Sequence, residues 1–235
     1  MREHGFRMYV AAITALLVAL PAAAATEERP VSGFHGIAVS VPAHVTVIQG
    51  KEERATLTAD RDTLAKIETV VDGGVLRVRF ANGADVHPTA PITLVVRLRS
   101  LDSVATAGTV TVEVPRLEGE RLAVNLAGSG RIVLPDLKLG ELSIDTSGHA
   151  HGLAIGRVDA LEVHAAGEGE INAVRLDAKR ANVRLAGSAK VVAWVRDRLD
   201  ARISGSGSVT YFGDPEVSSR VSGSGWVRRT GAAPP

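Results

Sequence analysis

The sequence predicts an all-β protein, a right-handed parallel β-helix (β-solenoid) with coils of about 18–20 residues. The first observation behind this prediction is a short motif of small residues around glycine that recurs through the second half of the chain. Its central glycines are almost evenly spaced, at Gly108, Gly128, Gly148, Gly167, Gly187, Gly205 and Gly223. Such near-constant spacing is typical of solenoids, in which each repeat is one coil stacked on the next.

The second observation is a set of apolar columns at fixed offsets from these glycines. The residues six, four and two before each glycine, and four after it, are mostly Val, Leu, Ile or Ala, with Gly152 as an exception. Alternate residues of a strand share a face, so these positions would stack into apolar ladders with strands about 4.8 Å apart. The positions between them are polar and are expected to face water.

The third observation is composition. The chain is 45% hydrophobic but only 3% aromatic, which suits stacked short strands with a core of small aliphatic residues. The 24 glycines have no period of three, which excludes collagen. No aliphatic residue recurs every six positions, and no copy has the aspartate of a calcium-binding nonapeptide roll. A right-handed solenoid of irregular coils remains.

Residues 1–25 are predicted to be a secretory signal peptide. Arg2 and Arg7 give a basic start, an apolar run extends from Val10 to Leu20, and the cleavage site falls between Ala25 and Thr26. That run is too short to span a membrane, so a periplasmic or extracellular protein without a transmembrane segment is expected. The remaining chain has 25 basic and 25 acidic residues, which gives no basic footprint for nucleic acid. The chain has no cysteine, hence no disulfide and no lipid-carrying cysteine.

Residues 26–32 are polar and are predicted to be a flexible leader. Strand patterns follow at 37–41, 45–48, 55–59, 75–80 and 92–98. The one good helix candidate is 60–67, where Asp60 is placed to cap the first turn and Leu64 and Ile67 share a face. The sequence leaves open whether residues 33–100 continue the solenoid or form a separate layer across one end.

The glycine-centred coils occupy the rest of the chain and complete one domain over residues 33–229. Small residues around each glycine predict a tight corner, where glycine permits positive φ or a close approach between coils. The last coil ends in a bulky, charged segment, Trp226 to Arg229, which is expected to cap the open end. Residues 230–235 are predicted to be a disordered tail.

Four motifs follow one another in a specific order. They are Phe34-x-x-Ile37-x-Val39, Asp60-x-x-x-Leu64-x-x-Ile67, Gly73-x-x-Leu76-x-Val78, and Leu98-x-x-Leu101-x-x-Val104-x-x-x-Gly108, which leads into the glycine copies. This order resembles the bacterial head-GIN-domain family, the head of an autotransporter adhesin, over residues 33–229. The resemblance implies an exported β-helical domain at the cell surface and brings no catalytic residue. Many relatives look like lipoproteins, and this chain departs from them because it has no cysteine.

Two successive coils carry the candidate metal ligands at equal offsets from their glycines. These candidates are His149, His151, Glu168 and Glu170. Stacking would bring two imidazoles beside two carboxylates, a ligand set that suits zinc. The alternative is a solvated ladder of alternating charge formed by Arg131, His151, Glu170 and Lys190. An external site lacks the outer groups that orient metal ligands, so the sequence favours the ladder and predicts neither metal nor cofactor.

Three arginines, each three residues before a glycine, form a column on successive coils: Arg184, Arg202 and Arg220. A spacing of about 4.8 Å makes this column a candidate anion-binding stripe for acidic glycans or lipid headgroups. In the alternative interpretation, Glu162 and Asp200 in a neighbouring column neutralise the arginines. The sequence favours this alternative because exposed charges contribute little in salt.

A carbohydrate-active enzyme, a lyase or a hydrolase, is the alternative to a binding protein, because β-helices host such enzymes. A glycosidase needs two carboxylates in a cleft, and the candidates are Asp145, Glu162, Glu168 and Glu170. Aromatic residues to line a sugar subsite are few, and no Gly-x-Ser-x-Gly motif is present.

The sequence therefore predicts an exported envelope protein that is not an enzyme and acts as an adhesin-like binding domain or a scaffold. The expected partner is a glycan or an envelope protein, with no role for nucleic acid.

Overall fold

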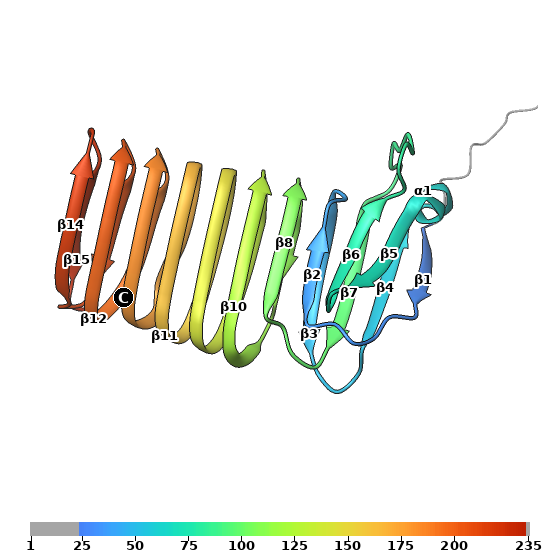
Figure 1. Cartoon of the computed structure of the whole chain (residues 1–235), viewed down its shortest axis with the longest axis horizontal. Helices are drawn as coiled ribbons and strands as arrows, with labels where there is room; N and C mark the ends of the chain where they lie inside the picture. Colours follow the sequence, from blue (N-terminus) through green and yellow to red (C-terminus); the bar gives the residue numbers. More distant parts are fainter. Residues whose placement is uncertain (1–23, 234–235) are drawn as a thin grey trace, which may run out of the picture.

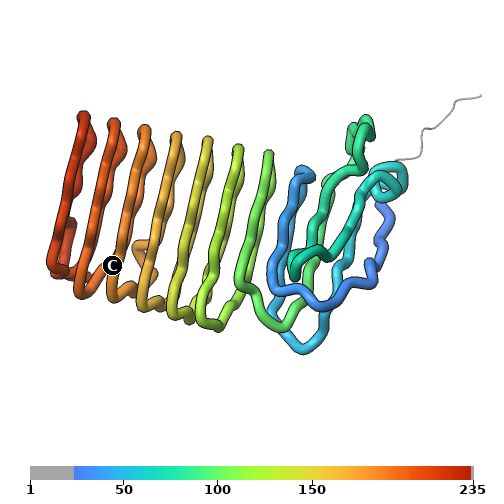
Figure 2. Tube along the Cα trace, in the orientation of Figure 1, coloured from blue at the N-terminus to red at the C-terminus, as the bar shows by residue number. Residues whose placement is uncertain are grey.

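The computed structural model describes residues 24–233 and shows an elongated β-solenoid whose strands stack along its long axis (Figure 1). One sheet of 15 strands winds through about six turns, and the coils are seen side by side along the Cα trace (Figure 2). The predicted fold class is confirmed. Most of the predicted signal peptide, residues 1–23, lies outside the described residues. Within the described residues, no helix is long and apolar enough to cross a membrane.

The elements of the first part of the chain are β1 (Ala25–Arg29), β2 (Gly36–Val39), β3 (Ala43–Gln49), β4 (Arg54–Ala59), α1 (Arg61–Lys66), β5 (Ile67–Asp72), β6 (Val75–Phe80) and β7 (Ile92–Leu98). The elements of the second part are β8 (Ser103–Gly108), β9 (Thr111–Glu113), β10 (Leu117–Gly128), β11 (Arg131–Gly187), β12 (Lys190–Gly205), β13 (Ser208–Phe212), β14 (Glu216–Ser222) and β15 (Trp226–Gly231). The five strands predicted before residue 100 correspond to β2, β3, β4, β6 and β7, whereas β5 was not predicted.

Successive coils pair in parallel and in the register that the glycine spacing predicts. Leu122 lies opposite Leu142 between β10 and β11, and Gly187 lies opposite Gly205 between β11 and β12. The predicted apolar columns fill the interior, where their side chains in the central coils are less than about a tenth exposed. Gly152 interrupts its column because a Cβ there would lie 2.9 Å from Cδ1 of Ile171, whose side chain fills the space.

The coil becomes shorter between β11 and β12, and the register shows where. The pairing skips three residues of β11 between Ala173 and Asp177, and a second shift between Ala178 and Arg180 gives one residue back, because there two residues of β12 and one of β11 are skipped. Such β-bulges absorb extra residues without disturbing the strands on either side. The shortening therefore happens at one corner, and the columns on the glycine-bearing strands stay aligned.

The central glycines form a corner that other residues would strain. Gly187 has φ +113, and a Cβ placed on it would lie 2.5 Å from the carbonyl oxygen of Gly167 in the preceding coil. Gly108, in the first coil of the column, has φ +88 but nothing within 4 Å of an added Cβ. Both predicted reasons for glycine, positive φ and close backbone approach, are confirmed at Gly187.

The N-terminal strands continue the solenoid and then close it, which answers the question that the sequence left open. β2 pairs in parallel with β8 and β6, and β3 pairs in parallel with β9 and β7. Antiparallel strands follow at the end: β4 beside β7, β1 beside β4, and β5 beside β6. This end carries β1 and α1 in Figure 1.

The predicted flexible leader, residues 26–32, differs from the structure because β1 begins at Ala25. Ala25 lies opposite Ala59 and Arg29 lies opposite Ala55 in the pairing with β4. The pairing rests on main-chain hydrogen bonds, supported by contact between the hydroxyls of Thr26 and Thr58 at 2.9 Å. An edge strand of this kind needs no alternation of apolar residues, so its polar sequence looked like a leader.

The predicted helix is confirmed as α1. Asp60 is its N-cap, and the carboxylate of Asp60 accepts a hydrogen bond from the backbone N–H of Thr63 at 2.8 Å. Leu64 and Ile67 are both buried, at 0% and 4% exposure. The helix therefore packs as a plug at the N-terminal end of the core.

The predicted cap, Trp226 to Arg229, forms most of β15 but leaves part of the C-terminal end open. Trp226 remains 40% exposed, and the guanidinium of Arg228 lies 4.6 Å from the centre of its ring. Val217 and Val221, which continue two interior columns, are 39% and 40% exposed. The predicted disordered tail, residues 230–235, overlaps β15, which extends to Gly231, and residues 234–235 lie outside the described residues.

Candidate functional site

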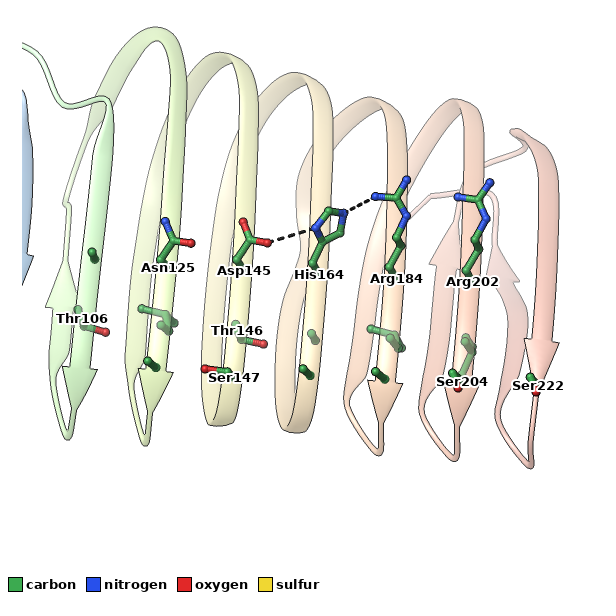
Figure 3. A pocket seen from close by; sticks show the side chains of 18 of the residues that line it. Thr106, Asn125, Asp145, Thr146, Ser147, His164, Arg184, Arg202, Ser204 and Ser222 are labelled. Atoms are coloured by element: carbon green, nitrogen blue, oxygen red, sulfur yellow. Dashed lines mark hydrogen bonds and ion pairs between the residues drawn. The ribbon is translucent and has the colours of Figure 1, made fainter.

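A shallow groove of about 850 Å³ runs along the solenoid, across the strands that precede the glycine corners (Figure 3). The five central coils each contribute the residues three, two and one before their glycine. Ala105 and Thr106 on β8 line one end of the groove, and Arg220 and Ser222 on β14 line the other. The groove thus crosses seven successive strands, and its length is set by how many of them keep the same register.

Small side chains in one outward column create the groove. These residues stand directly before the glycines and are Ala127, Ser147, Ala166, Ala186, Ser204 and Ser222. Buried aliphatic residues of the next column back, such as Leu126, Leu185 and Ile203, complete a mostly apolar lining. The sequence analysis attributed the small residues only to the corner. The signal that it missed was an outward column without a single large side chain.

One rim of the groove carries larger polar side chains, three residues before the glycines, and three of them are linked. Nδ1 of His164 lies 3.2 Å from Oδ1 of Asp145, and Nη1 of Arg184 lies 2.7 Å from Nε2 of His164. Figure 3 shows the three side chains reaching toward one another across successive coils. Asp145 and His164 both stand three residues before their glycines, so stacking of the coils makes them neighbours.

These contacts place the imidazole between a cation and an anion on the rim. A guanidinium only donates hydrogen bonds, so Arg184 is the donor in its contact with Nε2 of His164. The ring of His164 thus links Arg184 to the carboxylate of Asp145.

The arginine column has the register that the sequence predicts. Arg184 lies opposite Arg202, and Arg202 lies opposite Arg220. Spacing of strands at about 4.8 Å brings three like charges close together along the rim. This arrangement concentrates positive potential at the C-terminal half of the groove.

Within residues 24–233, Glu162 and Asp200 form no ion pair with this column. Asp200 instead accepts a hydrogen bond from Nε of Arg198 at 3.1 Å, two residues away on the same strand. That bond raises the pKa of the Arg198 guanidinium above its usual value. No carboxylate of the described chain lies within 4.0 Å of the guanidinium of Arg202 or Arg220. Both arginines are therefore available to an anion.

The four candidate metal ligands do not converge. Nε2 of His149 lies 3.2 Å from Oε2 of Glu168, but His151 and Glu170 do not join this pair. In the described part of the chain, no group of three or more side chains is placed to hold a metal ion. Glu170 lies opposite Lys190 instead, as the ladder interpretation predicts.

The candidate carboxylates of the enzyme alternative are also dispersed. Asp145 lines the groove and is bound to His164, whereas Glu162 lines a separate depression with Arg180 and Arg198. Glu168 is paired with His149 outside both. Asp145 is therefore the one carboxylate among the residues that line the groove, and a glycosidase needs two.

The fold and this surface together define a β-solenoid with a groove along its side. The chain belongs to the family described as "Putative auto-transporter adhesin, head GIN domain", which it matches over residues 33–215. The resemblance seen in the sequence motifs is thereby confirmed. No curated protein matches the chain.

Several solved structures share the shape of this chain. A "putative adhesin" of Bacteroides fragilis is 19% identical with a TM-score of 0.85, covering 88% of this chain and 97% of that one. A "putative lipid binding protein" of Parabacteroides distasonis is 26% identical with a TM-score of 0.72, covering 88% and 96%. A "putative adhesin" of Parabacteroides merdae is 19% identical with a TM-score of 0.71, covering 88% and 96%. At 19% identity, the two adhesin structures are similar to this chain in fold alone.

Proposed function

We propose that this protein is an exported, non-catalytic binding domain of the cell envelope whose groove holds an elongated anionic amphiphile. The observation that carries the proposal is an arginine column beside an apolar groove of about 850 Å³. Such a volume is in the usual range for small-molecule sites, which combine an apolar lining with a few polar groups that orient the ligand.

The two ends of the groove differ in charge, and this difference orients the ligand. The end on β8 and β10 is lined by Ala105, Asn125 and small residues without a cation. The opposite end carries Arg202 and Arg220, for which no carboxylate partner lies within reach in residues 24–233. An acidic headgroup would lie over the arginines, and an acyl chain would extend along the alanine-rich floor toward β10.

The relatives support a binding role. The matching family and two of the similar structures are named for adhesion, and the 26% identical protein of Parabacteroides distasonis is named for lipid binding. Adhesion takes place at the cell surface, in agreement with the signal-peptide pattern in residues 1–25. None of these names describes an enzyme.

The chemistry of the lining favours an acyl chain over a sugar. Sugar sites commonly offer aromatic faces, and no aromatic side chain is among the residues that line the groove. The aliphatic and alanine side chains offer no polar pattern that would match a row of hydroxyl groups. An acidic glycan would meet the arginine rim and the scattered hydroxyls of Ser147, Ser204 and Ser222, but no aromatic face.

The proposal is tested by calorimetric titration of the purified protein with three probes. Lysophosphatidylglycerol has an acidic head and one acyl chain, lysophosphatidylcholine has the same chain without net charge, and oligogalacturonate has charge without a chain. We expect the first to bind most tightly, and its affinity to fall as salt rises from low to physiological concentration.

Two sets of variants separate the contribution of the ligand's headgroup from that of its acyl chain. Replacing Arg184, Arg202 and Arg220 together by Ala should weaken binding of lysophosphatidylglycerol by about tenfold or more, whereas Arg198→Ala, outside the groove, should not. Ala186→Phe should block the floor and weaken both lipids. Equal affinity for oligogalacturonate would shift the assignment to acidic glycans, and no binding of any probe by the folded protein would refute the groove as a ligand site.

A further inference from the structure

The C-terminal end of the solenoid exposes apolar side chains that elsewhere lie in the core. The large hydrophobic residues exposed in the described part of the chain are Val70, Val217, Val221 and Trp226. Three of these four belong to β14 and β15 at this end. At the opposite end α1 and the antiparallel strands close the core, and Leu64 is fully buried. The core is therefore covered at the N-terminal end and partly exposed at the C-terminal end.

β14 also has a free main-chain edge. In the described chain it pairs with β12 on one side and with no strand on the other. The next strand along the chain, β15, is a poor pairing edge because its charged side chains cover it. Arg228 stacks over Trp226, and Nε of Arg229 donates a hydrogen bond to the carbonyl oxygen of Gly213 at 2.7 Å. Charged side chains of this kind protect natural edge strands from pairing. β14 has no such protection at Val217 or Val221.

We propose that β14 pairs antiparallel with β14 of a second copy of this chain, about a twofold axis at Ser219. This register places Val217 of each copy opposite Val221 of the other, so two valine pairs form by symmetry. Directly opposite residues in antiparallel strands contribute most to sheet stability when both are β-branched or aromatic. The pairing would extend the sheet across both molecules and cover the exposed valines.

The charges of β14 are also self-complementary in this register. Glu216 would lie diagonal to Arg220 of the second copy, and diagonal neighbours are within reach of long side chains. Within one chain Arg220 lies opposite Arg202, another cation, so the second copy would supply a carboxylate that the chain itself does not. The two Arg220 side chains are also diagonal to each other, and each would have a Glu216 on its other side.

A twofold arrangement closes after two copies. Because each molecule has one such end, the symmetric contact is satisfied in a dimer and does not propagate into a filament. Arg184 and Arg202 would remain on the groove rim, whereas Arg220 would lie beside Glu216 of the second copy, so the dimer would leave two of the three rim arginines to a ligand of the groove.

Sedimentation equilibrium of the purified protein tests the dimer. We expect a monomer–dimer equilibrium whose dissociation constant rises by about tenfold or more in Val217→Lys, because a lysine replaces an apolar partner twice. Val70→Lys, at a similarly exposed valine of β5, is the matched control and should leave the equilibrium unchanged. A monomer at all concentrations, species larger than a dimer, or an equal effect of both variants would overturn the proposal.

Cysteine cross-linking tests the register, since the chain has no cysteine of its own. Residues directly opposite in antiparallel strands have Cα atoms about 5 Å apart, within disulfide range. Ser219→Cys should therefore form an oxidised dimer with itself. Ser222→Cys, three residues from the axis on the same exposed strand, should form one more slowly by at least about tenfold. Equal rates for the two variants would refute this register, and circular dichroism checks that both are folded.

Discussion

At the scale of single residues, glycine and its small neighbours decide where coils turn and where the groove lies. Gly187 has φ +113, and its backbone approaches Gly167 so closely that a methyl group would meet the carbonyl oxygen at 2.5 Å. The residue before each glycine is small and faces outward, which leaves the groove floor low. The same short motif therefore determines both where the coils turn and where the candidate site lies.

This geometry predicts the cost of adding a methyl group at the corner. Gly187→Ala should lower the free energy of unfolding by about 3 kcal/mol, because backbone strain and a main-chain clash both apply. Gly108→Ala, with φ +88 and open space around the methyl group, should cost only about 1 kcal/mol from strain. Urea denaturation of both variants measures the difference, and equal losses would contradict the role of close packing between coils.

At the scale of elements, α1 shows how a short helix closes the core. Six residues are too few for a stable isolated helix, so α1 depends on its cap and on the packing of Leu64. Hydrogen bonds from the backbone N–H and the hydroxyl of Thr63 lower the pKa of the Asp60 carboxyl from 3.8 to about 2. The backbone N–H of Thr89 donates to the same carboxylate at 3.2 Å and connects the helix to the loop between β6 and β7.

The depressed pKa of Asp60 predicts a pH dependence of stability. A carboxyl whose pKa is lower in the folded state stabilises the protein above its unfolded pKa and loses that contribution as pH falls. We expect the wild type to melt at a higher temperature than Asp60→Asn at pH 6, and this difference to shrink between pH 4 and pH 2. Thermal melts of both proteins across this range provide the measurement. A difference that stays constant down to pH 2 would show that the charge has no such role.

At the scale of the whole molecule, the solenoid is a linear array in which each coil contacts mainly its neighbours. The N-terminal end is covered by antiparallel strands and α1, whereas the C-terminal end leaves two core columns exposed at Val217 and Val221. The groove follows the same axis, so its length and its charge gradient both come from the order of coils.

The difference between the middle and the end of this array can be measured with one substitution at two places. Val163→Ala, at 0% exposure in a central coil, should lower the free energy of unfolding by about 2–3 kcal/mol. Val217→Ala, at 39% exposure in the last coil, should change it by about 0.5 kcal/mol or less in dilute monomeric protein. Similar losses at both positions would mean that the last coil is as well packed as the centre.

The repeat, the apolar columns, α1 and the arginine column were predictable because each depends on spacing along the chain. A solenoid converts a fixed spacing into stacking, so residues at equal offsets from Gly128 and Gly148 must become neighbours. This explains why the row from Arg184 to Arg220 was visible in the sequence. The edge strand β1 was missed because main-chain pairing leaves no pattern of apolar residues.

The sequence by itself determined the coil and its columns, since period and polarity are properties of the chain. Only the tertiary structure decided which partners meet, because contacts of a few ångströms depend on side-chain direction and on what lies in the next coil. Asp200 binds Arg198 of its own strand rather than Arg202, and His149 meets Glu168 without the other two candidate ligands. The groove and the open end likewise depend on space that neighbouring coils fill or leave empty.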